Sequence, residues 1–304
     1  MPLTPADWHA RFTRQAAWTR ALRAYLFPRA GIAIPAQVHH DEKNSQAEAS
    51  VSTAHPADAA LDAKNAAGRA IEAQPDGTPS VPGSKTRRVL EVGCGTGAIL
   101  AELPESVTLT AGLDLDFAFL SLAQRSDPRA RLTQGDALAL PYADRAFDAA
   151  LCHFLLLWVA DPFQVLREMA RVTRPGGAVL ALAEPDYGGR VDFPAELAAL
   201  GAWQRESLRR QGADPLMGRR LAGLFHKAGL KNVETGVLGG QWSGFPDWDA
   251  WESEWAVLES DLTQTSETVN IPEVQKLKAL DRSATERGER VLFVPTFYAW
   301  GSVP

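Results

Sequence analysis

The sequence predicts an α/β protein built on a seven-stranded, mostly parallel β-sheet with helices on both faces. Three observations lead to this prediction. From Arg87 onward, short apolar runs alternate with helical patterns, and a glycine-rich turn follows the first run. Upstream of Arg87 lies a long stretch too poor in large apolar residues to build a second core. Strand, helix and strand in alternation give a parallel sheet with right-handed crossovers.

The first expected element is an N-terminal helix. Thr4-Pro5-Ala6-Asp7 has the pattern of a capping box with proline at the first helical position. The helix is expected to continue to Phe27 and to be stopped by Pro28 and Gly31. Residues 1–35 are therefore predicted to form a helical cap.

Residues 36–86 have the composition of a linker. They contain no Phe, Trp or Tyr, and twelve of them are Ala. Such a segment cannot bury enough apolar surface to offset its ordering entropy, so a flexible, disordered insertion is predicted here. Residues 87–304 are left as one main domain.

Within that domain, a helix is clearest at Asp161–Arg174, where Asp161 caps it, Pro162 opens it and Pro175-Gly176-Gly177 ends it. A further helix is expected at Pro215–Ala228. Because proline removes a ladder donor, Pro295 predicts a bulge or break in the last strand. The expected strands are 89–92, 109–115, 131–133, 147–152, 178–183, 233–242 and 291–300.

Composition narrows the function classes. The net charge of −6 disfavours binding to phosphate backbones or anionic lipids, so no nucleic-acid partner is expected. Cys94 and Cys152 are too few for a disulfide framework, and no zinc-ligand spacing is present, which fits a reduced, cytoplasmic protein without a metal. The longest strongly apolar run, Phe154–Ala160, has seven residues, whereas a membrane span needs about 20. No membrane span or secretion signal is expected, and the oligomeric state stays open.

The motif with chemical content is Glu91-Val-Gly-Cys-Gly-Thr-Gly97, which closes the first strand and is expected to open a helix. Glycines allow a tight turn and close approach of a ligand at the carboxyl edge of a parallel sheet. Asp114 lies 21 residues past Gly93 and could bind ribose hydroxyls. Because Gly93, Gly95 and Ala98 also fit the dinucleotide pattern, these residues alone leave NAD possible as the ligand.

Other motifs separate the alternatives. Glu91 precedes the glycines, a third glycine stands at 97, Gly135-Asp136-Ala137 follows the third strand, and Arg174-Pro-Gly-Gly177 precedes the fifth. Over residues 87–184 this set resembles the class I S-adenosylmethionine-dependent methyltransferases. It is most similar to the type 11 group that includes the ubiquinone and menaquinone C-methyltransferases. The resemblance implies a Rossmann-like fold, S-adenosyl-L-methionine as cofactor, and methyl transfer to a small molecule.

The resemblance also implies a cofactor site. The turn at 93–97 would cradle the methionine part, Asp114 would bind the ribose, and Asp136 would meet the adenine edge. Glu91 would hold the turn or the methionine ammonium. The cofactor residues implied are Glu91, Gly93, Cys94, Gly95, Thr96, Gly97, Asp114, Leu115, Gly135, Asp136, Ala137 and Cys152.

Candidate catalytic residues follow the fourth and fifth strands. His153 could accept or orient a substrate proton, or it could simply be a packed histidine. Asp186 and Tyr187 could polarise a nucleophile beside a substrate contact from Glu184, although Asp in a turn often serves the backbone. No strong base is obligatory, because displacement on a sulfonium relies mainly on alignment.

A tryptophan-rich helical insertion, at about 243–289, is expected before the last strand. Trp248, Trp251 and Trp255 are spaced i, i+3 and i+7, hence on one helical face. That face either packs on the sheet domain or covers an apolar or aromatic substrate, with Trp248 and Trp251 as its contacts. Two alternative functions remain. They are an NAD-dependent oxidoreductase, for which Tyr187 lacks a Tyr-x-x-x-Lys partner, and a non-catalytic cofactor-binding regulatory protein.

Overall fold

The computed structural model describes residues 4–33, 88–238, 247–265 and 271–304. The chain divides into two units, one made of Met1–Ile34 with Gly83–Pro304 and the other of Pro35–Pro82. All described residues belong to the first unit. The linker predicted at 36–86 lies outside the described residues.

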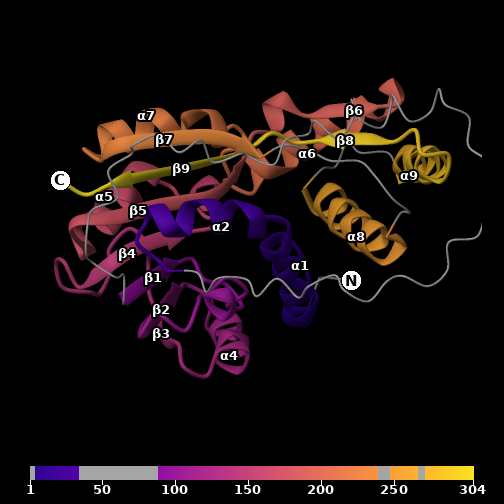
Figure 1. Cartoon of the computed structure of the whole chain (residues 1–304). Helices are drawn as coiled ribbons and strands as arrows, with labels where there is room; N and C mark the ends of the chain where they lie inside the picture. Colours follow the sequence, from indigo (N-terminus) through magenta and orange to yellow (C-terminus); the bar gives the residue numbers. More distant parts are fainter. Residues whose placement is uncertain (1–3, 34–87, 239–246, 266–270) are drawn as a thin grey trace, which may run out of the picture. The chain divides into compact units, whose positions relative to one another are not determined.

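The core of the unit is a seven-stranded sheet in the order β3-β2-β1-β4-β5-β9-β7 (Figure 1). Only β9 runs antiparallel to its neighbours, β5 and β7, and the other pairings are parallel. The predicted seven-stranded, mostly parallel sheet is therefore confirmed. Its strands are β1 (Arg88–Val92), β2 (Leu109–Asp114), β3 (Arg131–Gln134), β4 (Phe147–Cys152), β5 (Thr173–Pro185), β7 (Lys231–Leu238) and β9 (Thr296–Ser302).

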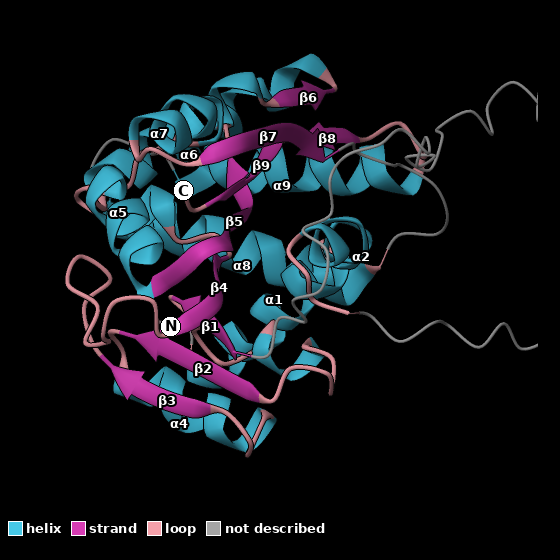
Figure 2. Ribbon diagram, turned by 60° about the vertical axis from the view of Figure 1, so that its left-hand side comes forward, coloured by secondary structure: helices cyan, strands magenta, loops and turns pink. Residues whose placement is uncertain are grey.

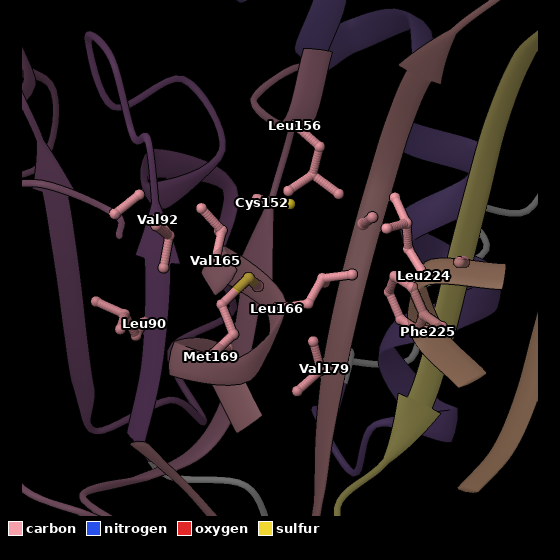
Figure 3. Packing of buried hydrophobic residues seen from close by; sticks show 14 of the residues in the cluster. Leu90, Val92, Cys152, Leu156, Val165, Leu166, Met169, Val179, Leu224 and Phe225 are labelled. Carbon is pink, nitrogen blue, oxygen red and sulfur yellow. The ribbon is translucent and has the colours of Figure 1, made fainter. Parts of the chain in front are cut away.

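Helices cover both faces of the sheet (Figure 2). The helices are α1 (Pro5–Trp18), α2 (Arg20–Arg29), α4 (Phe117–Ser126), α5 (Pro162–Val172), α6 (Ala198–Arg210), α7 (Leu221–Lys227), α8 (Trp248–Thr265) and α9 (Ile271–Glu286). Helices α5 and α7 bury Leu166, Met169 and Phe225 in one core with strand residues such as Val179 (Figure 3). Helices α2 and α4 contribute to a second core with β1, β4 and β5. Among the described residues, no helix combines the length and the apolar run needed to cross a bilayer.

The N-terminal region forms two helices where one was expected. The predicted capping box is confirmed, because Asp7 Oδ2 accepts from the Thr4 amide at 2.8 Å and Thr4 Oγ1 accepts from the Asp7 amide at 3.3 Å. The helix breaks at Thr19, whose hydroxyl bonds back to the carbonyls of Gln15 and Ala16, each at 3.2 Å. Such back-bonding competes with the regular helical ladder. The second helix also continues past Pro28 to Arg29, so the predicted end at Phe27 was two residues too early.

Three other boundaries differ from prediction. The glycine turn does not open a regular helix but leads through turns to a short 3₁₀ segment, Leu100–Glu102. Strand β5 begins at Thr173, so the Pro-Gly-Gly sequence expected to end the preceding helix is already inside the strand. A Cβ on Gly177 would lie 2.5 Å from the Asp148 carbonyl oxygen, which explains why glycine stands there. The helix expected at 215–228 narrows to Leu221–Lys227 after a 3₁₀ turn.

The predicted break at Pro295 is confirmed. Before it, β8 (Val291–Phe293) pairs antiparallel with β6 (Val191–Phe193) in a separate two-stranded sheet. After it, β9 enters the main sheet. The predicted strand at 233–242 is observed as β7 up to Leu238, and its last four residues lie outside the described part. The helical insertion is present as α8 and α9, which share a third apolar core with α6.

Candidate functional site

A cavity of about 510 Å³ opens at the carboxyl ends of β1, β2, β4 and β5. This volume is within the range of small-molecule sites, and this edge is where open α/β sheets bind ligands. Helices α1, α6 and α8 close the remaining sides. The lining residues are Trp8, Arg11, Phe12, Gln15, Glu91, Gly93, Cys94, Gly95, Ala98, Ile99, Asp114, Phe119, His153, Phe154, Leu155, Leu157, Trp158, Pro185, Tyr187, Gln204, Leu208, Gln211 and Val257.

The glycine turn forms one wall of the cavity and needs its glycines. Gly93, Gly95 and Gly97 have φ of +71°, +51° and +79°, a left-handed region that L-residues enter at a cost. A Cβ on Gly93 would also lie 2.7 Å from Leu155 Cδ1. The turn is held to β2, because the Gly93 and Cys94 amides both donate to the Leu113 carbonyl at 2.7 and 3.0 Å. The backbone can therefore approach a ligand more closely than any side-chain-bearing residue would allow.

Glu91 places an unsatisfied carboxylate oxygen in this wall. The residue is only 2% exposed, and within the described part of the chain its Oε2 has no hydrogen-bond partner. Burial raises the pKa of Glu91 well above its usual range, Arg23 opposes this shift, and Asp114 adds to it. A buried carboxyl with an open lone pair is a place where a cationic ligand group would be favoured.

Asp114 lines the same wall and closes the glycine turn. Its Oδ2 accepts from the Gly95 amide at 2.7 Å and its Oδ1 from the Asp116 amide at 2.9 Å. Burial raises the pKa of Asp114, while these amide donors lower it. Each carboxylate oxygen can accept more than one hydrogen bond, so Asp114 can hold the turn and still bind hydroxyls in the cavity.

Helix α1 forms a wall that the sequence did not assign to the site. Trp8, Arg11, Phe12 and Gln15 all line the cavity, and their i, i+3, i+4, i+7 spacing is one helical face. This spacing was a readable signal, but nothing local says what the face covers. The ring of Phe12 lies 3.1 Å from the position a Cβ on Gly95 would take.

Thr96, inside the glycine turn, binds helix α1 through a side-chain hydrogen bond. His9 Nδ1 lies 2.8 Å from Thr96 Oγ1, across 87 residues of sequence. Thr96 is buried and does not itself line the cavity. Its part in the site is therefore to hold α1 against the turn.

His153 lines the cavity, and its ring is also in hydrogen-bond contact with Thr19. Its Nε2 lies 3.0 Å from Thr19 Oγ1, which also accepts from Arg23 Nη1 at 2.7 Å. Burial, followed by the Arg23 charge, lowers the pKa of His153 to about 3. The imidazole is neutral at neutral pH, and a base of such low pKa gains little from taking a proton. This geometry favours an orienting or packing role over that of a proton acceptor.

The low pKa of His153 makes the free energy of unfolding depend on pH in the acidic range. Below about pH 6.5 the unfolded chain binds a proton here that the folded chain does not, so unfolding is favoured as pH falls from 6.5 towards 3. At pH 5.5 this one group should cost about 1.4 kcal/mol, and nothing above pH 7.5. Urea unfolding of the parent and of His153→Gln at both pH values checks this. Equal pH dependence of the two proteins would contradict the assignment.

Tyr187 lines the cavity, whereas the two carboxylates beside it do not. Asp186 accepts from the Gly188 amide at 2.9 Å and pairs with Arg219 Nη2 at 2.8 Å. Glu184 is fully buried and accepts from the backbone amides of Leu155, Leu156 and Leu157 at 2.7 to 3.1 Å. Burial raises the pKa of Glu184 to about 8, and the three amides oppose that shift. Both carboxylates hold loops, as the backbone alternative proposed for Asp in this turn anticipated.

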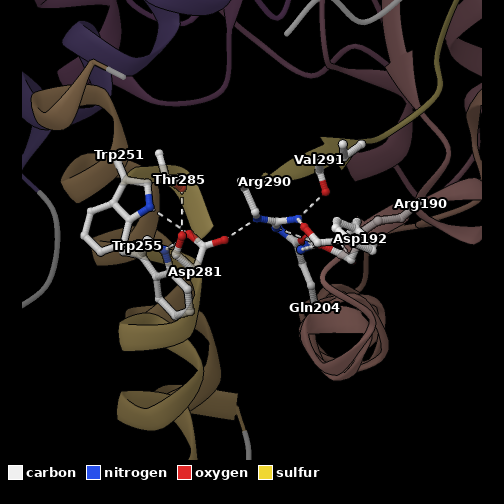
Figure 4. Close-up of polar contacts among 10 residues, drawn as sticks. Arg190, Asp192, Gln204, Trp251, Trp255, Asp281, Thr285, Arg290 and Val291 are labelled. Atoms are coloured by element: carbon white, nitrogen blue, oxygen red, sulfur yellow. Dashed lines mark hydrogen bonds and ion pairs between the residues drawn. The ribbon is translucent and has the colours of Figure 1, made fainter. Parts of the chain in front are cut away.

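The tryptophan face packs on α9 (Figure 4). Trp251 Nε1 and Trp255 Nε1 donate to Asp281 Oδ2 at 2.7 and 2.8 Å, and the Arg282 guanidinium lies 4.8 Å from the Trp248 ring centroid. Of the described α8 side chains, Val257 reaches the cavity and the tryptophans do not. The structure therefore favours packing over a substrate lid.

The remaining expected cofactor residues are not among those that line the cavity. Leu115 is 71% exposed, and Asp136 is exposed. Gly135 is half-buried, and Ala137 is buried behind it. Cys152 is fully buried in the sheet core, and burial raises its pKa well above the usual range. Their assignment to the cofactor stays a prediction.

Comparison with known proteins finds similar chains. Residues 90–181 match the family described as "Methyltransferase domain". A demethylmenaquinone methyltransferase of Bacillus licheniformis is 36% identical over 173 residues, which are 49% of this chain and 73% of that protein. A demethylmenaquinone methyltransferase of Renibacterium salmoninarum is 37% identical over 115 residues, but the match spans only 37% of this chain and 47% of that protein.

A solved structure shares the fold. It is a protein of Anabaena variabilis assigned as a methyltransferase from an antibiotic biosynthesis pathway. The two chains superpose with a TM-score of 0.53 at 15% identity, over 72% of this chain and 92% of the other. At this identity the likeness shows the fold alone.

Proposed function

The chain belongs to the class I S-adenosylmethionine-dependent methyltransferases, and from that premise we propose that it methylates a small, apolar or aromatic molecule. The observation that carries the proposal is that one cavity joins the glycine turn to aromatic walls from Trp8, Phe12 and Trp158. Membership in this family selects S-adenosylmethionine over NAD as the cofactor. The acceptor must then reach the methyl group from the helical side of the same cavity.

The residues of the cavity fit this cofactor. The open oxygen of Glu91 suits the methionine ammonium, and the glycine turn leaves the room that a Cβ would fill. Asp114 is placed at the strand end where ribose hydroxyls would be bound. When bound, the cofactor supplies a methyl group already activated as part of a sulfonium.

The chain itself would contribute alignment and exclusion of water. Trp8 and Phe12 close the cavity over the turn, and the neutral imidazole of His153 is fixed by Thr19. An in-line displacement gains most of its rate from such positioning. The two carboxyl groups of the cavity lining, Glu91 and Asp114, are assigned to the cofactor, and His153 has a pKa of about 3. The acceptor atom must then be nucleophilic by itself or be helped by Tyr187.

The named relatives suggest the size and type of the acceptor. Two of them are demethylmenaquinone methyltransferases, which by their name act on a demethylated quinone. We propose a ring compound of comparable character for this chain, since aromatic walls bind flat apolar rings well.

Calorimetry with S-adenosylmethionine and S-adenosylhomocysteine tests the proposal. We expect micromolar dissociation constants, about −8 kcal/mol, and no binding of NAD. Asp114→Ala should weaken both ligands by about 10- to 150-fold, because it removes a charged acceptor worth about 1.5–3 kcal/mol. Asp144→Ala, at an exposed acid paired with Arg171, is the matched control. Parent-like binding by Asp114→Ala would show that the ribose lies elsewhere, and a lack of methyl transfer in a metabolite screen would favour a non-catalytic role.

A further inference from the structure

We propose that Gln204 is a hydrogen-bond donor to the methyl acceptor and restricts it to molecules with an acceptor oxygen facing helix α6. The oxygen would belong to a carbonyl, phenolate or carboxylate group on the ring. The inference rests on the proposed function, because it concerns the molecule that shares the cavity with the cofactor. It adds a polar selection to a cavity that also has aromatic walls from Trp8, Phe12 and Trp158.

The orientation of the Gln204 amide follows from its neighbour. Arg190 Nη1 lies 2.5 Å from Gln204 Oε1. A guanidinium has donors and no acceptor, so the amide oxygen must face Arg190 and the NH₂ group must point away from it. Gln204 lines the cavity, and among the described residues its Nε2 has no hydrogen-bond partner. The side chain therefore offers the cavity two donor hydrogens and no acceptor.

Arg190 is fixed by a buried ion-pair network (Figure 4). Its Nε and Nη2 bind Asp192 Oδ2 and Oδ1 at 2.7 and 2.9 Å, and the two side chains are 5% and 2% exposed. Arg290 Nη2 donates to the same Asp192 at 2.8 Å and connects onward to Asp281. A bidentate pair held on both sides cannot rotate to accommodate a flipped amide. The donor face of Gln204 is thus set before any ligand arrives.

The rest of the α6 face is consistent with such a site. Leu208, one turn further along, and Gln211, a second turn along, also line the cavity. Gln211 is already engaged by the protein, because its Nε2 lies 3.2 Å from Ser207 Oγ. A hydroxyl can donate or accept, so of these two glutamines it is Gln204 whose amide orientation is fixed by a donor-only neighbour. A ring that buried Gln204 without offering it an oxygen would leave a donor unpaired, which penalises binding.

The test compares 1-tetralone with tetralin, which have the same bicyclic frame with and without a carbonyl. Each is titrated calorimetrically into the full chain saturated with S-adenosylhomocysteine. We expect the parent to bind 1-tetralone about tenfold more tightly than tetralin, which corresponds to about 1.4 kcal/mol. Gln204→Met should lose this preference, and Gln204→Glu should lose it too, since a carboxylate keeps the bond from Arg190 but has no donors. Arg209→Met, at an exposed position of the same helix outside the cavity lining, should keep it.

The outcomes separate the two proposals. Binding of S-adenosylhomocysteine is measured first for every variant, and its absence in the parent would overturn the proposed function and this inference with it. With normal cofactor binding, the inference alone is overturned if the parent shows no preference for the ketone, including the case where neither probe binds. It is equally overturned if Gln204→Met retains the preference. Melting temperatures like that of the parent confirm that the variants are folded.

Discussion

Replacing Asp281 by Ala is expected to lower the free energy of unfolding by about 3–5 kcal/mol. Asp281 is 5% exposed, and its carboxylate accepts from both Trp251 Nε1 and Trp255 Nε1 and pairs with Arg290. Without this carboxylate, the two indole N–H groups lose their acceptor. The Arg290 guanidinium, which is itself only 10% exposed, loses part of its pairing. Uncompensated buried charge is among the most costly single changes a fold can suffer.

Urea unfolding measures the loss, and the matched control is Glu286→Ala on the same helix. Glu286 pairs with Arg282, but both side chains are about half exposed. Exposed pairs contribute about 0–1 kcal/mol, so the control should stay close to the parent. A loss from Asp281→Ala no larger than that from Glu286→Ala would mean that Asp281 is not the centre of the network.

The sheet could be predicted from sequence because its signals are local. Buried strands read as short apolar runs, and the helix at α5 is bounded by Asp161, Pro162 and the Pro-Gly-Gly stop. The break between α1 and α2 could not be predicted from local sequence. The Thr19 hydroxyl at this break also contacts His153, which is 134 residues away. Helix α6 was missed because its apolar partners, Trp255 and Leu258, are likewise distant in sequence.

In the candidate site, too, some features could be predicted from local sequence and others depend on tertiary packing. The glycine turn was readable because positive φ demands glycine at Gly93 and Gly97. The α1 wall and Gln204 were not assigned, since what a helical face covers depends on tertiary packing. Glu184 was placed correctly at the strand end, but its buried carboxylate serves three backbone amides rather than the cavity.

The sharpest test of the cofactor half of the cavity is Glu91→Gln. We expect it to weaken S-adenosylmethionine and S-adenosylhomocysteine about 10- to 150-fold, through loss of a charge-assisted bond worth about 1.5–3 kcal/mol. The ligand-free protein should be as stable as the parent or more so, because Oε2 has no partner there among the described residues and a neutral amide is less costly to bury. Affinity and stability should therefore change in opposite directions.

A control ligand and a pH series make this result specific. 5′-Methylthioadenosine lacks the amino acid part, so calorimetry should find its affinity equal in parent and Glu91→Gln. Because the pKa of Glu91 is raised in the free protein, and an ammonium selects the ionised carboxylate, affinity of the parent for S-adenosylhomocysteine should increase as the pH rises through the range in which Glu91 ionises. The variant should show no such increase. Equal weakening of methylthioadenosine would instead mean that Glu91 holds the shape of the glycine turn, and that the ammonium binds elsewhere in the cavity.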